Sequence, residues 1–135
     1  MSVSTGGGAS NVAVHAVRAG GRAAVLSTTG DGPRAAAILR DLAAAGVDTS
    51  PVIVRRGHDA DLLLLLCDPG GDWVALEQLD PALRLAISDL GPAIPFDRAT
   101  WFHVDGYAHH TAGSQCATAR RGDRDACDAR GLGRG

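Results

Sequence analysis

The sequence lacks several residue types on which common enzyme chemistries depend. All 13 basic residues of the 135 are arginine, so a phosphate-binding P-loop lysine, a Schiff-base lysine and a protein-kinase strand lysine are excluded. Among the 15 acidic residues, Glu77 is the one glutamate. The longest apolar run, 62–67, falls far short of the roughly 20 residues of a membrane span. What remains is a chain of a length and composition that suit one compact domain.

Cysteine is also scarce, and charge is nearly balanced. The three cysteines, Cys67, Cys116 and Cys127, form no CxxC pair and no metal-type spacing, so we expect incidental or structural roles in a reducing compartment. A formal net charge of -2 gives no general attraction to nucleic acid or to anionic membranes. The N-terminus shows no basic region followed by an apolar stretch, so no secretory signal is expected and the predicted location is cytoplasmic.

Apolar periodicity predicts an alternation of helices and strands. Helices are expected over 11–19, with Ser10 as a possible cap, and over 33–45, with Pro33 in the first turn. A turn is expected over 28–32, and 79–90 is ambiguous, with a helix from about Pro81 as one interpretation. Strands are expected over 23–27, 51–55, 61–67, 72–78 and 100–105. This order predicts an α/β layered domain with a mainly parallel sheet, to which an antiparallel hairpin over 61–78 is attached.

The last twenty residues depart from this pattern. Residues 116–135 hold five arginines, four glycines and four alanines, and Leu132 is their one large aliphatic residue. Such a segment buries too little apolar surface to offset its ordering entropy, so a disordered, low-complexity tail is predicted. A basic tail that binds nucleic acid and the product of a shifted reading frame are the two other interpretations.

The segment with the most chemical content is glycine-rich and opens the first predicted helix. Gly6 and Gly7 leave the backbone open to a ligand, because no β-carbon stands in the way. Asn11 offers one acceptor and two donors, which suit a pair of vicinal hydroxyls. A flexible linker followed by a helix cap is the plainer interpretation. The dinucleotide pattern GxGxxG fits poorly, since Asn11 replaces its third glycine and no strand precedes it.

Several motifs in a fixed order carry a family resemblance. They are Gly6-Gly7-x-x-x-Asn11-x-Ala13, Arg18-Ala19-Gly20-Gly21, 24–31 (AVLSTTGD), 42–49 (LAAAGVDT), 62–71 (LLLLLCDPGG) and 103–107 (HVDGY). Together these motifs resemble the N-terminal portion of the PfkB (ribokinase-like) carbohydrate kinases, over about residues 5–110.

The resemblance implies a function for the parts that match. PfkB kinases transfer the γ-phosphoryl group of ATP to a hydroxymethyl of a sugar or nucleoside, and ATP with Mg²⁺ is therefore the implied cofactor. Gly6, Gly7 and Asn11 would bind the hydroxyls of the substrate. Gly30 and Asp31 would have a mainly structural role, although Gly32 and Ala35 depart from the family pattern after them. The 61–78 hairpin resembles strands near the lid over the sugar site.

The departures from the family limit what the resemblance implies. A strand with a sugar-binding aspartate normally precedes the paired glycines, and the catalytic half carries a Gly-Ala-Gly-Asp type motif with the general base and the nucleotide site. Neither is found in these 135 residues. We therefore expect no catalytic, cofactor-binding or metal-binding residues here. The expected organisation is a partial kinase domain over 1–115 with a tail over 116–135, a truncated fragment that is inactive alone.

Other site chemistries are less favoured by the sequence. The adjacent His109 and His110 would point to different sides of a strand and have no carboxylate at ligand spacing nearby. All five histidines are expected to be exposed or half-buried without a metal: His15, His58, His103, His109 and His110. Asp59 and Asp61 could form a carboxylate pair on one face of a strand, but a solvated strand start is favoured. Trp73 and Trp101 are expected to pack against the sheet. The alternative function is a non-catalytic module that binds a polyol or a partner chain, with a homodimer through an exposed sheet edge as one form.

Overall fold

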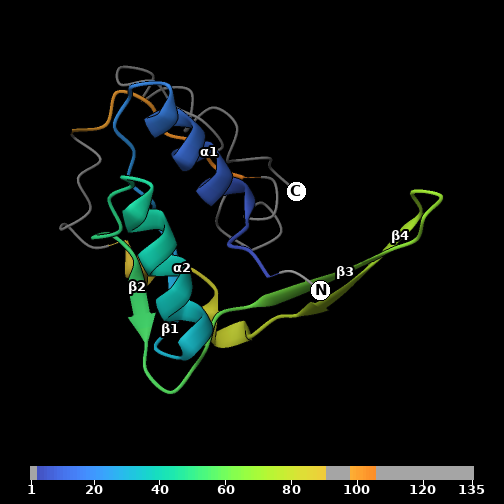
Figure 1. Ribbon diagram of the computed structural model, residues 1–135. Helices are drawn as coiled ribbons and strands as arrows, with labels where there is room; N and C mark the ends of the chain where they lie inside the picture. Colours follow the sequence, from blue (N-terminus) through green and yellow to red (C-terminus); the bar gives the residue numbers. More distant parts are fainter. Residues whose placement is uncertain (1–2, 91–97, 106–135) are drawn as a thin grey trace, which may run out of the picture. The chain divides into compact units, whose positions relative to one another are not determined.

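The computed structural model describes residues 3–90 and 98–105, and the chain divides into two units. Unit 1 comprises Met1–Ala23 with Ala86–Gly135, and unit 2 comprises Ala24–Leu85. Unit 1 holds helix α1 (Gly8–Arg18) and the 3₁₀ turn η2 (Ile87–Asp89) (Figure 1). The elements of unit 2, in chain order, are β1 (Thr28–Gly30), α2 (Pro33–Ala44), β2 (Ile53–Arg55), β3 (Leu62–Cys67), β4 (Trp73–Gln78) and the 3₁₀ turn η1 (Pro81–Leu83).

A parallel βαβ crossover forms the first half of unit 2. β1 pairs with β2 in parallel, with Thr28 opposite Ile53 and Gly30 opposite Arg55, and α2 connects the two strands. This arrangement confirms the predicted α/β class and the parallel sheet. The predicted strand boundaries were wrong, because 23–27 contributes an isolated bridge at Ala24 and the regular strand lies where a turn was expected. The ladder forms there since the β-branched Thr28 and Thr29 lie opposite β2, ahead of the Gly30-Asp31 turn.

Helix α2 begins and ends where the sequence signals predict. Pro33 occupies the first turn, where its missing N–H would have had no helical partner. At the other end Gly46 has a φ of 82°, and the N–H of Val47 donates to the carbonyl of Leu42 at 3.0 Å. This Schellman-type closure brings two buried aliphatic residues together at the end of the helix, since Leu42 and Val47 are 3% and 4% exposed.

Strands β3 and β4 form the predicted antiparallel ribbon. The register runs from Leu62 opposite Gln78 to Cys67 opposite Trp73. At the turn the N–H of Asp72 donates to Asp68 Oδ1 at 3.0 Å, and Gly71 has a φ of 94°. Figure 1 shows the two strands as a paired ribbon. Every residue of both strands is exposed, so leucines are open on both faces of the ribbon.

Several local predictions were wrong in the described residues. Helix α1 starts at Gly8 rather than at residue 11, so Ser10 lies inside the helix and Gly7 is the N-cap, with no side-chain cap. The predicted strand over 100–105 is not formed. The interval 79–90, which was ambiguous in the sequence, forms two 3₁₀ turns, the first of which begins at Pro81. Trp73 and Trp101, which were expected to pack against the sheet, are instead 65% and 58% exposed. The predicted tail, 116–135, lies outside the described residues.

The buried residues of the described chain are few and mostly small. They are Ala13 in unit 1 and, in unit 2, Val25, Gly30, Ala35, Leu42, Val47, Ala60 and Leu83, with Thr29 as a buried polar residue. The buried residues of unit 2 lie in and next to the β1–α2–β2 crossover, in the segment that precedes β3, and in η1. Their burial indicates that these three parts of unit 2 pack together. In the part of the chain described, no helix has the length and apolar character needed to cross a membrane.

Candidate functional site

The predicted substrate-binding residues lie at and before the start of α1. Gly7 is the N-cap with a φ of 103°, a conformation that L side chains rarely adopt, and the N–H of Asn11 donates to its carbonyl at 3.0 Å. Gly6, Gly7 and Asn11 are all exposed. A β-carbon at Gly6 would meet no atom within 4 Å. The structure thus leaves the two glycine backbones and the Asn11 side chain accessible on one helix start.

Asp105 lies against this same helix start, and sequence reasoning gave it no role. A β-carbon on Gly8 would come 2.9 Å from Asp105 Oδ2 and 3.1 Å from its Cβ. Glycine at position 8 therefore allows the carboxylate to approach the first turn of α1, a position that the helix dipole favours for negative charge. The signal was present in the HVDGY motif at 103–107, which was used for the resemblance without assigning Asp105.

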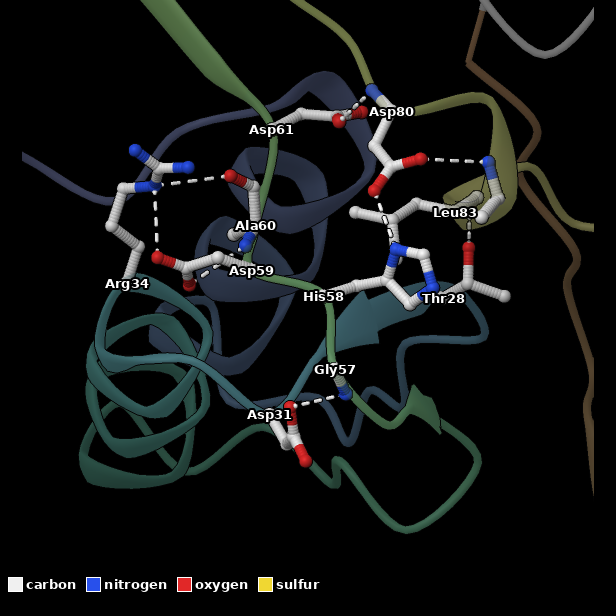
Figure 2. Close-up of polar contacts among 11 residues, drawn as sticks. Thr28, Asp31, Arg34, Gly57, His58, Asp59, Ala60, Asp61, Asp80 and Leu83 are labelled. Atoms are coloured by element: carbon white, nitrogen blue, oxygen red, sulfur yellow. Dashed lines mark hydrogen bonds and ion pairs between the residues drawn. The ribbon is translucent and has the colours of Figure 1, made fainter.

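In unit 2, Gly30 and Asp31 hold the turn after β1 against the segment before β3 (Figure 2). A β-carbon on Gly30 would overlap the carbonyl of His58. Asp31 Oδ1 accepts a hydrogen bond from the N–H of Gly57 at 2.9 Å, and the N–H of Asp31 donates to the His58 carbonyl at 3.0 Å. These contacts give Gly30 and Asp31 the structural role that was expected of them.

Asp59 caps helix α2 from a distant part of the chain. Its Oδ1 accepts from the N–H of Ala35 in the first turn of α2 at 3.0 Å, and its Oδ2 lies 3.3 Å from Arg34 Nε. Partial burial of the Asp59 carboxyl raises its pKa. The N–H groups of Ala35 and Ala60 and the Arg34 cation outweigh that effect and lower the pKa below its ordinary value. Asp59 is therefore a structural anion at a helix N-terminus.

Asp80 forms a second polar centre at the base of the ribbon, where β3 begins and β4 ends. Its Oδ2 lies 2.6 Å from His58 Nδ1, its Oδ1 accepts from the N–H of Ala82 at 2.9 Å, and its own N–H donates to Asp61 Oδ1 at 2.8 Å (Figure 2). The hydrogen bond from His58, followed by that from Ala82, lowers the pKa of the Asp80 carboxyl. Asp59 and Asp61 have different partners, so the carboxylate pair considered from the sequence is not formed.

The described residues contain no metal-type cluster of three histidine, cysteine, aspartate or glutamate side chains. Cys67 is an exposed free thiol at the turn end of β3. His15 and His103 are exposed and His58 is half-buried, whereas His109, His110, Cys116 and Cys127 lie outside the described residues. No Mg²⁺ site is therefore assigned within residues 3–90 and 98–105.

Comparison with known protein families shows which family this chain belongs to. Residues 1–121 match the pfkB family carbohydrate kinase. The chain belongs to the PfkB family. A search of curated proteins gives no match. The match confirms the resemblance carried by the glycine-rich helix start and the Gly-Asp turn, and PfkB sugar kinases generally use ATP and Mg²⁺.

Solved structures give the same fold over part of their length. A ribokinase-type protein from Agrobacterium tumefaciens is 34% identical with a TM-score of 0.54, over 58% of this chain and 26% of that one. The fructokinase from Vibrio cholerae O395, in its apo form, is 27% identical with a TM-score of 0.54, over 63% of this chain and 30% of that one. The fold is therefore ribokinase-like, and this PfkB chain spans less than a third of either structure.

Proposed function

We propose that this chain carries the acceptor-binding portion of an ATP-dependent sugar kinase. Gly6, Gly7 and Asn11 bind hydroxyls of a sugar or nucleoside, whose hydroxymethyl group receives the γ-phosphoryl in the complete reaction. The carrying observation is the start of α1, where an open glycine backbone precedes an exposed asparagine in a chain of the PfkB family. Ribokinase and fructokinase structures among its neighbours support a pentose or hexose as substrate.

The chemistry of this portion is positioning. The Asn11 amide offers an oxygen acceptor and two N–H donors to neighbouring hydroxyls, and the glycines let those hydroxyls approach the backbone. Phosphoryl transfer also requires neutralisation of the phosphate charge and a base for the acceptor hydroxyl. Because these 135 residues contain neither lysine nor a Gly-Ala-Gly-Asp motif, we infer that this chain binds an acceptor without transferring phosphate.

The test is a sugar titration of the 135-residue chain by isothermal calorimetry or by amide chemical shifts. D-ribose and D-fructose are the probes, and Asn11→Ala is the variant. Loss of hydrogen bonds to the sugar is expected to weaken binding about tenfold. His15→Ala, one turn further along α1 and also exposed, is the matched control and should keep the parent affinity. Equal affinities of Asn11→Ala and the parent chain, or no binding of either sugar by the parent, would refute the proposal.

A second candidate function is association with another copy of this chain, and one specific observation favours it. The ribbon exposes leucines on both faces, and Glu77 is the one charged residue in its two strands. Open apolar strand edges are templates for pairing with a further strand, and a net charge of -2 opposes it little.

Sedimentation velocity of the parent chain and of Leu65→Lys tests this homodimer. A charge at the middle of β3 is expected to shift the parent dimer to monomer. Thr49→Lys, which adds the same charge outside the ribbon, should leave the dimer intact. A parent chain that sediments as a monomer at all concentrations would refute association.

A further inference from the structure

The β3–β4 ribbon has almost no side-chain packing to hold it in place within unit 2. All residues of Leu62–Cys67 and Trp73–Gln78 are exposed. A two-stranded ribbon with no buried side chain is oriented mainly through the segments that enter and leave it. These are 58–61, which leads into β3, and 79–83, which follows β4.

The segment that enters the ribbon is fixed to α2 and to the turn after β1. Asp59 caps α2 through the N–H of Ala35, and Arg34 Nε donates to the carbonyl of Ala60 at 3.1 Å. Ala60 is 5% exposed, and the backbone at His58 lies directly against Gly30. The entering segment is thus held by hydrogen bonds, an ion pair and close packing that do not involve the ribbon.

The segment that leaves the ribbon is fixed separately, to β1. Leu83 in η1 is 7% exposed, and its carbonyl accepts a hydrogen bond from the hydroxyl of Thr28. Residues Leu79, Pro81 and Ala82 between β4 and this attachment are exposed. The entering segment is therefore attached to α2 and to Gly30 at the end of β1, and the leaving segment to Thr28 at the start of β1.

Asp80 joins the two segments. Its N–H donates to Asp61, its Oδ2 contacts His58, and both of these partners belong to the entering segment. Its Oδ1 accepts from Ala82 in η1, on the leaving segment. Figure 2 shows the Asp80 side chain between His58 and η1, with Asp61 reaching its backbone. We propose that Asp80 is the positioning residue that sets the angle of the ribbon relative to the crossover β1–α2–β2.

The length of the ribbon explains why a contact at its base has a large effect at its tip. Six residues per strand extend about 20 Å at ~3.3 Å per residue, so a small rotation at Asp80 becomes a large displacement of Cys67. With the Asp80 carboxylate removed, the His58 contact between the segments is lost, as is the cap on Ala82 within the leaving segment. Only the Asp61 contact to the Asp80 backbone then still joins the two segments. The attachments on α2 and β1 are untouched, so the crossover should keep its fold while the ribbon samples several angles.

Pulsed electron–electron double resonance measures this angle directly. Spin labels are placed at Cys67 and at an Ala43→Cys site on the exposed side of α2, in a Cys116→Ser, Cys127→Ser background of the full chain diluted with unlabelled protein. The parent chain is expected to give one narrow distance distribution, and Asp80→Ala a broadened or displaced one. Asp72→Ala, which removes an aspartate at the opposite end of the ribbon, is the control and should match the parent.

Hydrogen exchange and two further variants make the test decisive. In folded Asp80→Ala, the amide of Ala82 should exchange about tenfold faster, because its side-chain acceptor is gone. Should Asp80→Ala fail to fold, His58→Ala and Asp61→Ala each remove one partner and should each broaden the distribution. A folded variant, judged by circular dichroism and denaturant unfolding, that keeps the parent distribution would overturn the inference, as would a parent chain whose distribution is already broad. None of these measurements depends on sugar binding.

Discussion

At the scale of single residues, glycine has two separate uses in this chain. Gly6 and Gly7 leave backbone open to solvent, whereas Gly30 lets the turn after β1 lie against the carbonyl of His58. Open backbone at Gly6 and Gly7 would let a ligand approach, whereas the missing side chain of Gly30 allows two parts of the chain to pack closely. The two can be distinguished by adding a single methyl group.

Gly30→Ala should destabilise the chain strongly. Its β-carbon would overlap backbone atoms that cannot move away without displacing the segment before β3, and we expect a loss of at least about 3 kcal/mol. Urea unfolding followed by circular dichroism measures this loss. Gly6→Ala, whose β-carbon meets nothing within 4 Å, serves as control and should change stability by less than about 1 kcal/mol. Similar unfolding midpoints for the two variants would contradict the packing role of Gly30.

The Asp59 carboxyl should make the stability of the chain sensitive to acid. Its pKa is lowered in the folded state, so its contribution is fully present above the unfolded pKa of about 3.9 and is lost as pH falls through the folded pKa. Asp59→Asn should therefore be less stable than the parent at pH 7, and the difference should shrink below about pH 4. Urea unfolding at pH 7 and at pH 3 measures both; a difference that is constant over this range would show that Asp59 acts without its charge.

At the scale of secondary-structure elements, the leucines of α2 and of the ribbon differ in how far they are buried. Leu42 in α2 is almost fully buried, whereas the leucines of β3 are exposed on both faces of the ribbon. A leucine therefore does not make a fixed contribution to the free energy of unfolding. Its contribution depends on the surface that its element covers.

Leu42→Ala and Leu65→Ala form a matched pair that tests this difference. Leu42 is 3% exposed and should cost about 3 kcal/mol when truncated, because the deletion leaves a cavity beside α2. Leu65 is 53% exposed and should change the free energy of unfolding of the monomer by about 0.5 kcal/mol or less. Unfolding at low protein concentration separates the monomer from any dimer. A large loss for Leu65→Ala under these conditions would mean that the ribbon is covered in solution.

At the scale of the whole molecule, the chain is a PfkB sequence that spans a minor part of the sugar kinase structures it matches. Its described core consists mainly of alanine, valine and leucine residues, and β1–β2 is a parallel pair of three residues each. Parallel sheets are usually covered on both faces and have more strands. The stability of the isolated chain is therefore expected to be low, near the lower limit for a domain of this size.

The isolated chain should release no ADP above background. The assay combines the 135-residue protein with ATP, Mg²⁺ and a panel containing D-ribose and D-fructose, and follows ADP with a coupled enzyme. The reason is that the role proposed for Asn11 and its neighbouring glycines is to orient an acceptor, whereas transfer also requires a general base and a phosphate-binding helix start. Sustained turnover that Asn11→Ala abolishes would show that this chain contains the missing groups.

The elements predicted correctly are those with strong local signals. Pro33 and Gly46 delimit α2, and the turn 68–71 between apolar runs delimits the ribbon. The strand predictions for 23–27 and 100–105 were wrong, and 79–90 stayed ambiguous, since short apolar stretches have no intrinsic periodicity and adopt the structure that their neighbours allow. The roles of Gly6, Gly7 and Asn11 in binding remain a prediction.

The sequence by itself determined the α/β class, the family, the absence of lysine chemistry and the positions of α2 and the ribbon, because these depend on local composition and on motif order. Tertiary structure decided which aspartates act together. Asp59 lies 24 residues from Ala35 and Asp80 lies 22 residues from His58, and no local pattern connects residues so far apart. Such contacts are set by the packing of α2, β1 and η1, which places hydrogen-bond donors beside carboxylates that the chain alone leaves unassigned.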